Sequence, residues 1–221
     1  FRFSICWSRI YPLGDEETPN EEGLKFYDDV FNECLKYGIQ PVVTLNHFDM
    51  PVYLAQHQDG WLSRNTVDCF LRYCQTVFER YKGKVKYWMT FNEINLLRGY
   101  ATLGIHEMNT QKYYQALHHL FIASAKAVQL GHQIDSDNQI GMMLANILTY
   151  PETCNPADIA LELNVSRRLK YFFSDVQCRG YYPSYILKQW EKENIEIIKE
   201  SQDDQILKDG CVDLVIIILV L

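Results

Sequence analysis

The chain has 221 residues, 48% of them hydrophobic and 14% aromatic, which is enough for one packed core and argues against a disordered protein. Its 28 acidic and 21 basic residues give a formal net charge of −7, which argues against a nucleic-acid partner, since phosphate binding needs clustered Lys and Arg. No apolar run approaches the about 20 residues that cross a bilayer, so no membrane partner is expected.

The first predicted strand, FRFSICW at residues 1–7, mixes aromatic and β-branched residues, and a loop follows Pro12. Apolar residues then recur at helical spacing from Gly23 to Tyr37, and Gly38 is placed to end that helix. A second strand, IQPVVTLNHF at 39–48, lacks strict alternation, which is typical of a strand covered on both faces.

The middle of the chain repeats this alternation of strand and helix. Asn65 is expected to cap a helix that ends before Gly83 and carries its apolar residues on one side. VKYWMTFNE at 85–93 is predicted to be the third strand, and a longer helix ending near Gly131 leads to a fourth, QIGMMLANIL at 139–148.

Two more elements complete the pattern. Asn155, followed by a proline, is expected to open a helix that runs to about Cys178. A short helix around Trp190 leads to the last predicted strand, CVDLVIIIL at 211–219. The apolar run extends to Leu221 and, if exposed, has the uncharged, β-branched pattern of an aggregation-prone strand.

Strands that alternate with helices predict an α/β protein with a parallel sheet, either a doubly wound open sheet or a (β/α)8 barrel. The sequence contains neither of the glycine-rich nucleotide motifs that usually mark the open sheet. Instead, polar residues follow several strands, where a barrel builds its active site, so we favour a barrel and a single domain over residues 1–221. These residues are His47 and Asp49, Asn92 and Glu93, and Asn146.

The stretch YWMTFNEIN ends a buried strand in an amide, Asn92, and a carboxylate, Glu93. Partial burial raises the pKa of a carboxylic acid, which lets such a group give a proton to a leaving oxygen near neutral pH. An adjacent amide can hold a sugar hydroxyl, and aromatic faces can stack on sugar rings. On strand position alone, however, a structural role is the commoner one for these residues. The aromatic candidates are Trp7, Phe48, Trp61 and Trp88.

The seven cysteines are scattered and lack the C-x-x-C spacing of a zinc or redox site. Thiols in this odd, scattered arrangement are typical of a reducing compartment. We therefore expect a cytoplasmic protein that uses neither a metal nor a cofactor.

Long stretches of the chain resemble glycoside hydrolase family 1, the β-glucosidase family, in order and at matching spacing. They are RFSICWSRIYP, YGIQPVVTLNHFDMP, GWLSRNTVDCFLRYCQTVFERY, VKYWMTFNEIN and HHLFIASAKAV. The resemblance covers Phe1 to about Asp213 and implies a partial (β/α)8 TIM barrel that holds roughly strands 2 to 6 of eight. TCNPAD and FFSDVQCRGYYPSY further resemble the bacterial 6-phospho-β-glucosidases, which implies a phosphorylated disaccharide as substrate.

The resemblance also assigns roles. It makes Glu93 the general acid/base, Asn92 the partner of the sugar 2-hydroxyl, and His47 a donor to the glycone. Arg2 would lie beside the nucleophile and keep it ionised. Ile94, where the family often has proline, also suits the phospho subgroup. The implied mechanism is retaining, in which one carboxylate attacks the anomeric carbon while the other carboxyl group protonates the leaving group.

The family's nucleophile is a glutamate in a T-E-N-G-like motif on the seventh strand, and this sequence has no such motif. We therefore expect a barrel truncated at both ends, cut before Phe1 and after Asp213, that is inactive alone. The alternative is a non-catalytic sugar-binding or assembly module, which would self-associate through its open sheet edges.

Overall fold

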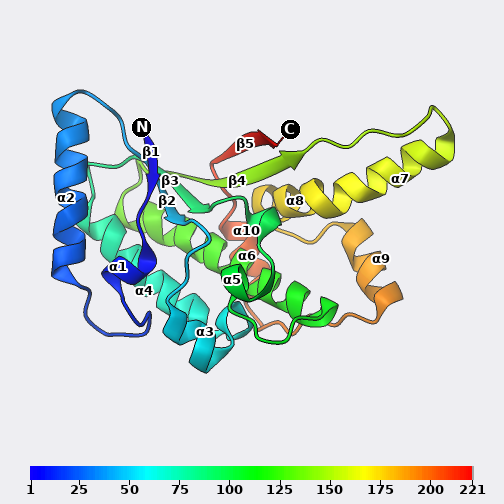
Figure 1. Cartoon of the computed structure of the whole chain (residues 1–221), viewed down its shortest axis with the longest axis horizontal. Coiled ribbons are helices and arrows are strands. Elements are labelled where there is room, and N and C mark those ends of the chain that lie inside the picture. The colour runs from blue at the N-terminus through cyan, green and yellow to red at the C-terminus, as the bar shows by residue number, and fades with distance from the viewer. Residues whose placement is uncertain (221) are drawn as a thin grey trace.

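The computed structural model describes residues 1–220, with only the backbone at Val220. Its centre is a sheet of five parallel strands whose spatial order repeats their order along the chain (Figure 1). Helices join successive strands, because a parallel pair needs a long crossover connection. The strands are β1 (Arg2–Ser4), β2 (Val42–Asn46), β3 (Tyr87–Phe91), β4 (Gln139–Ile147) and β5 (Leu214–Val220).

The helices differ widely in length, and none within residues 1–220 is both long and apolar enough to cross a membrane. Short segments precede or interrupt several of them: the 3-10 turns η1 (Gly60–Leu62) and η2 (Ile94–Leu96) and the π-helical η3 (Arg167–Tyr171). The α-helices are α1 (Trp7–Ile10), α2 (Glu21–Lys36), α3 (Val52–Gln58), α4 (Asn65–Arg80), α5 (Gly99–Leu103), α6 (Thr110–Ile134), α7 (Pro156–Ser166), α8 (Phe172–Arg179), α9 (Ser184–Glu193) and α10 (Asp203–Asp209).

The strand order decides between the two predicted architectures. In a doubly wound sheet the order reverses at a switch point, so it departs from the order of the sequence. Here it runs from β1 to β5 without reversal. That order excludes the doubly wound alternative and is the one that consecutive strands of a (β/α)8 barrel have.

The two faces of the sheet differ in character. On the helix-covered face, Thr90 of β3 shares a hydrogen bond of 2.9 Å with Ser124 of α6. On the opposite face, Arg2 of β1 reaches Thr44 of β2. The helix-covered face is otherwise apolar where Trp88 of β3 packs its ring 4.9 Å from that of Phe78 of α4, whereas the opposite face carries the charged guanidinium of Arg2.

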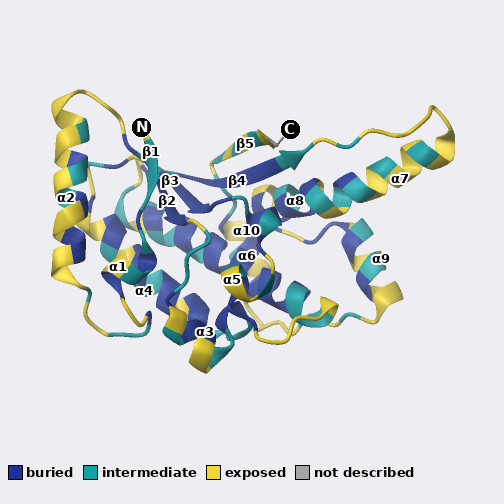
Figure 2. Ribbon diagram, viewed as in Figure 1, coloured by how far each residue is buried: buried dark blue, intermediate teal, exposed yellow. Residues whose placement is uncertain are grey.

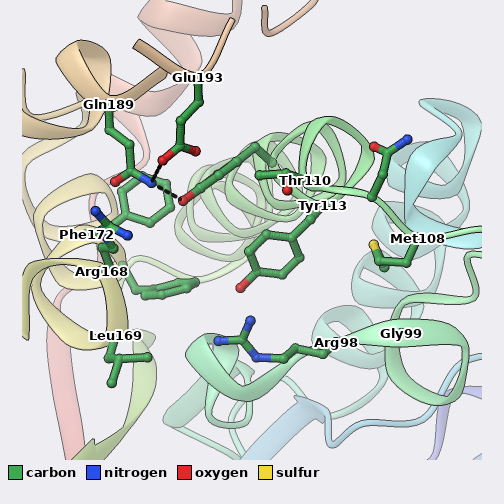
Figure 3. A pocket seen from close by; sticks show the side chains of 13 residues that line it. Arg98, Gly99, Met108, Thr110, Tyr113, Arg168, Leu169, Phe172, Gln189 and Glu193 are labelled. Atoms are coloured by element: carbon green, nitrogen blue, oxygen red, sulfur yellow. Dashed lines mark hydrogen bonds between the residues drawn. The ribbon is translucent and has the colours of Figure 1, made fainter. Parts of the chain in front are cut away.

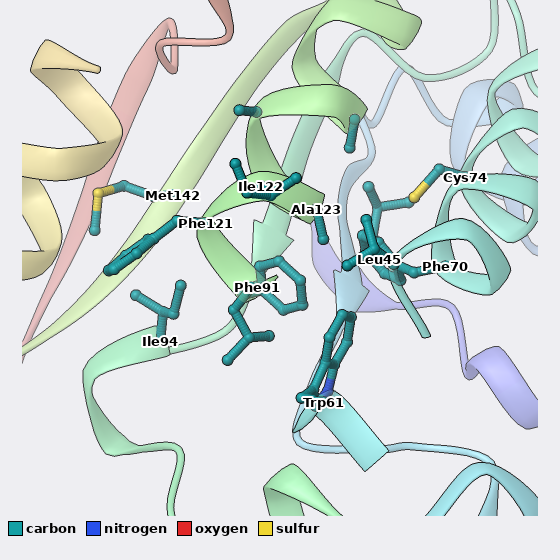
Figure 4. Close-up of a cluster of buried hydrophobic side chains, with 14 of the residues drawn as sticks. Leu45, Trp61, Phe70, Cys74, Phe91, Ile94, Phe121, Ile122, Ala123 and Met142 are labelled. Atoms are coloured by element: carbon teal, nitrogen blue, oxygen red, sulfur yellow. The ribbon is translucent and has the colours of Figure 1, made fainter. Parts of the chain in front are cut away.

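Large aromatic side chains fill the core between the sheet and its helices (Figure 4). Trp61, for example, packs its ring 5.4 Å from that of Phe91. Trp7, Trp61 and Trp88 are at most 1% exposed, so the prediction that they could stack on sugar rings is wrong. A large aromatic area favours burial. Of the four candidates, only Phe48 is half-buried.

Several predicted helix starts can be compared with the structure. Asn155 does cap its helix, because its side chain accepts a hydrogen bond of 2.9 Å from the Ala157 N–H. Asn65 does not; it is the first residue of α4, and its amide donates to Gln58 instead. The first strand is shorter than predicted, since Trp7 already begins α1.

The helix predicted from Asn155 to about Cys178 is divided by η3. A π turn inserts an extra residue, and this local feature leaves no clear mark on the hydrophobic period. The preceding α7 projects from the body, and most of its residues are exposed or half-buried (Figure 2).

Strand β5 carries exposed apolar side chains at alternate positions. Val215, Ile217 and Leu219 are 38%, 57% and 60% exposed. An aggregation-prone strand must be exposed to pair with another chain, and this run is exposed at these positions. The last residue of the run, Leu221, lies outside the described residues.

Candidate active site

A polar cluster joins the first three strands. The Arg2 guanidinium donates two hydrogen bonds to Thr44 Oγ1, at 3.1 and 2.9 Å, and a third to Asn92 Oδ1 at 2.6 Å. Asn92 follows β3 directly and is only 3% exposed. One side chain of β1 thus fixes the amide at the carboxyl end of β3, and two predicted site residues are in direct contact.

Glu93 occupies an unusual backbone conformation. Its φ of 40° and ψ of 53° lie in the left-handed region, which costs a residue with a Cβ about 1–2 kcal/mol. Phe48, just beyond β2, also has a positive φ, of 66°. Such strain at the ends of two neighbouring strands is characteristic of functional sites, because the surrounding structure must hold it in place.

His47 is placed by its neighbour Asp49. The Asp49 carboxylate accepts a hydrogen bond of 2.9 Å from the His47 N–H and one of 2.8 Å from the Trp7 N–H. It therefore ties the loop after β2 to the start of α1. The His47 residue is exposed, so it is not the core histidine that its strand position also allowed.

Charge links the predicted site residues. Burial lowers the pKa of Arg2, and the negative charge of Glu93 partly offsets that effect. Although the residue as a whole is exposed, partial desolvation of its ring lowers the pKa of His47, and so does the Arg2 charge, against the opposing effects of Asp49 and Glu93. Around pH 7 the site therefore combines a cationic guanidinium with a neutral imidazole, which can either donate or accept a hydrogen bond.

Three residues that support this cluster were not singled out from the sequence. Besides Thr44, the Asn46 carbonyl accepts a hydrogen bond of 2.8 Å from the Asn92 N–H. Asn95 fixes the loop after β3 to β4, because its amide donates to the Ala145 carbonyl and accepts from the Ala145 N–H. Thr44 and Asn46 alternate within a buried strand, and that polar spacing was a signal available in the sequence.

The arrangement combines a proton-transfer group with hydroxyl-binding groups. Glu93 can give or take a proton, and the amide of Asn92 can hold a hydroxyl group beside it. Within residues 1–220, no group of three or more His, Cys, Asp or Glu side chains gathers as a metal site. Glu93 and Asn92 together offer acid/base chemistry on a hydroxylated substrate.

The five parallel strands follow barrel order, and Asn92 and Glu93 come directly after β3, at the edge where a (β/α)8 barrel builds its active site. The family model for glycosyl hydrolase family 1 matches residues 1–217. The chain belongs to this family, as its sequence motifs predict.

Curated relatives agree with the family model. The chain is 48% identical to the aryl-phospho-beta-D-glucosidase BglA of Bacillus subtilis, covering 96% of this chain and 46% of that protein. It is 47% identical to a 6-phospho-beta-glucosidase of Clostridium longisporum, covering 95% and 45%. The chain therefore spans about half the length of the curated relatives it matches.

Solved structures agree on the fold. The family 1 β-glucosidase of Thermotoga maritima superposes with a TM-score of 0.85 at 29% identity, over 99% of this chain and 49% of that one. The predicted partial (β/α)8 barrel is confirmed. The roles assigned to Arg2, His47, Asn92 and Glu93 stay predictions.

Proposed function

We propose that this chain supplies the acid/base side of the active site of a retaining β-glucosidase. The observation that carries the proposal is the Arg2–Asn92 hydrogen bond of 2.6 Å, which fixes an amide directly before Glu93 at the carboxyl end of β3. A fixed amide and a neighbouring carboxyl group can hold a sugar and protonate its leaving group in one geometry.

Glu93 acts twice in the proposed mechanism. As an acid it gives its proton to the glycosidic oxygen while a second carboxylate attacks the anomeric carbon. As a carboxylate it then takes a proton from water, and the resulting hydroxide equivalent displaces the enzyme carboxylate from the sugar. The products are the free sugar and the released alcohol, and Glu93 regains its proton.

The other side chains position the sugar and the nucleophile. Asn92 binds the 2-hydroxyl, a contact that strengthens in the transition state. His47, exposed beside the cluster, donates to a hydroxyl of the glycone. Arg2 points its guanidinium into the polar face of the sheet, and its charge favours the ionised form of the attacking carboxylate.

The substrate that we propose is a 6-phospho-β-glucoside, such as a phosphorylated disaccharide. Support comes from the sequence motifs shared with bacterial 6-phospho-β-glucosidases and from relatives whose names specify phospho-glucosidase activity. A cytoplasmic location accords with this substrate class. It also accords with seven cysteines that are all free within the described residues.

The isolated chain is expected to show no measurable hydrolysis of p-nitrophenyl 6-phospho-β-glucoside, because its sequence has no T-E-N-G-like motif to supply the attacking carboxylate. Clear turnover by the isolated chain, abolished by Glu93→Gln, would contradict this expectation.

A chimera tests the proposed role directly. Residues 1–217 joined to the complementary part of the Bacillus subtilis relative should hydrolyse the same substrate, and Glu93→Gln should lower kcat at least a hundredfold, the usual worth of a general acid/base. The exposed Glu191 provides a matched control, and Glu191→Gln should leave kcat unchanged. An active chimera that tolerates Glu93→Gln would exclude the assignment.

A second candidate function is a non-catalytic assembly module. The exposed apolar residues of β5 favour it, because a strand with one unpaired edge can add a strand from another chain. A monodisperse monomer in light scattering would exclude self-association through this edge.

A further inference from the structure

A pocket of about 540 Å³ opens between the start of α6 and the helices η3, α8 and α9 (Figure 3). Its volume is within the range of small-molecule sites. Neither Glu93 nor the other three predicted site residues line it. The side chains that matter for its chemistry are Arg98, Tyr113, Tyr114, Arg168, Gln189 and Glu193.

Two arginines on opposite sides give the pocket its positive character. Arg98 comes from the loop after β3, whereas Arg168 comes from η3 (Figure 3). The Arg98 guanidinium lies 5.3 Å from the centre of the Tyr113 ring. The Glu193 carboxylate also lines the pocket, so the lining carries two guanidinium groups and one carboxylate. In a chain of net charge −7, a cavity whose lining carries this excess of positive charge fits an anion.

Tyrosine and amide groups add neutral donors and acceptors. Burial raises the pKa of Tyr113 to about 12, so its hydroxyl keeps its proton near neutral pH and can donate a hydrogen bond. Gln189 donates to the Tyr114 hydroxyl at 3.3 Å and to Glu193 at 3.1 Å. Amide, carboxylate and phenol groups arranged in this way can bind several hydroxyl groups.

The pocket wall is also coupled to the loop that carries Glu93. The Asn95 amide donates a hydrogen bond of 2.9 Å to the carbonyl of Leu169, which lines the pocket beside Arg168. Leu169 and Arg168 belong to the π turn, a deviation that frequently occurs at functional sites. Arg168 therefore lies on a segment of the pocket wall that the buried Asn95 side chain fixes in place.

We propose that this pocket binds a small polyhydroxylated organic anion, with the anionic group between Arg98 and Arg168 and the hydroxyl groups at Tyr113, Gln189 and Glu193. The shared chemistry is one oxyanion on a hydroxylated carbon chain, which either a sugar phosphate or a sugar acid provides. The proposal does not depend on hydrolysis by Glu93.

Isothermal titration calorimetry of the 221-residue chain with glucose 6-phosphate, gluconate and neutral glucose tests the proposal. At least one anion should bind with a Kd of about 1 mM or tighter, and glucose should bind more weakly, because it lacks the charge. Tighter binding of glucose 6-phosphate would identify the anionic group as a phosphate, and tighter binding of gluconate would identify it as a carboxylate. Arg98→Gln and Arg168→Gln should each weaken binding about tenfold, the usual worth of a charged hydrogen bond.

The controls separate this pocket from the predicted active site. Arg179→Gln removes an exposed arginine outside the pocket and should leave the Kd unchanged. Asn92→Ala should do the same. The proposal is overturned if neither anion binds saturably at about 10 mM. It is equally overturned if both pocket variants bind as the parent chain does, or if the binding depends on Asn92.

Discussion

At the scale of single residues, Glu93 carries its carboxyl group on a backbone conformation that residues with a Cβ disfavour. Its φ of 40° suits glycine, and the cost of the Cβ in that region is about 1–2 kcal/mol. The sequence located this residue at the end of a strand. It gave no sign of the left-handed turn, because glutamate has no preference for that conformation.

Substitution of Glu93 should separate strain from chemistry. Glu93→Gly relieves the left-handed strain, so the free energy of unfolding should exceed that of Glu93→Gln by about 1 kcal/mol. Glu93→Gln keeps the strain and serves as the matched control. Urea unfolding of both variants measures the difference, and a glycine variant no more stable than the glutamine variant would show that the turn is unstrained.

At the scale of elements, a buried cluster fastens the first residue of α10 to α6 and to the residue before α4. Arg64 donates to both carboxylate oxygens of Asp203, at 2.9 and 2.6 Å, and His118 bonds one of them at 2.8 Å. The other His118 nitrogen bonds the Tyr182 hydroxyl at 2.7 Å. His118 and Asp203 side chains are fully buried, so every polar group depends on these partners.

This cluster should make the fold sensitive to acid. Burial lowers the pKa of His118 to about 4 in the folded chain, although its bond to Asp203 acts in the opposite direction. The unfolded chain has a histidine pKa of about 6.5, so below that pH it binds a proton that the folded chain does not. Stability therefore falls as the pH drops, by about 2 kcal/mol between pH 6.5 and pH 5.

The protonation of Asp203 affects the stability of the fold in a lower pH range. Burial alone would raise its pKa, but the Arg64 guanidinium, the Glu200 N–H and His118 together lower it to about 2. Its contribution is present above the unfolded pKa of about 4 and is lost as the pH falls towards 2. It therefore adds little to the change between pH 6.5 and pH 5.

Chemical denaturation at a series of pH values checks the His118 prediction. His118→Gln should reduce the slope between pH 6.5 and pH 5, while the part due to His119 and His47, whose pKa values burial also lowers, remains. His57→Gln, at an exposed position on α3, serves as the control. An unchanged slope in the His118 variant would assign the acid sensitivity to other groups.

At the scale of the whole molecule, β5 gives the sheet an edge strand with an apolar row. Ile217 is 57% exposed in the middle of that row, and a single charge there should block both apolar contact and strand addition. If the chain self-associates through β5, Ile217→Lys should shift the mass measured by light scattering from the larger species to the monomer.

Leu161→Lys provides the matched control, because Leu161 is 64% exposed on α7, away from the sheet. It should leave the mass unchanged. Equal loss of association in both variants would indicate nonspecific apolar contact rather than pairing through β5.

The sequence alone determined the alternation of strands and helices, the parallel sheet and the place of Asn92 and Glu93 at the end of β3. These features follow from the local propensities of the residues and from the spacing of the apolar residues, and both can be read from neighbouring positions. The family motifs further predicted a barrel, because the order and spacing of these motifs can be read directly from the sequence.

Only the tertiary structure decided which polar groups meet and which aromatic rings are hidden. Arg2 and Asn92 are 90 residues apart, and His118 and Asp203 are 85 apart, yet each pair shares a hydrogen bond. Trp61 is buried for the same reason, since packing between distant elements sets its exposure. Such contacts depend on how the helices and strands assemble, and no short stretch of sequence contains that information.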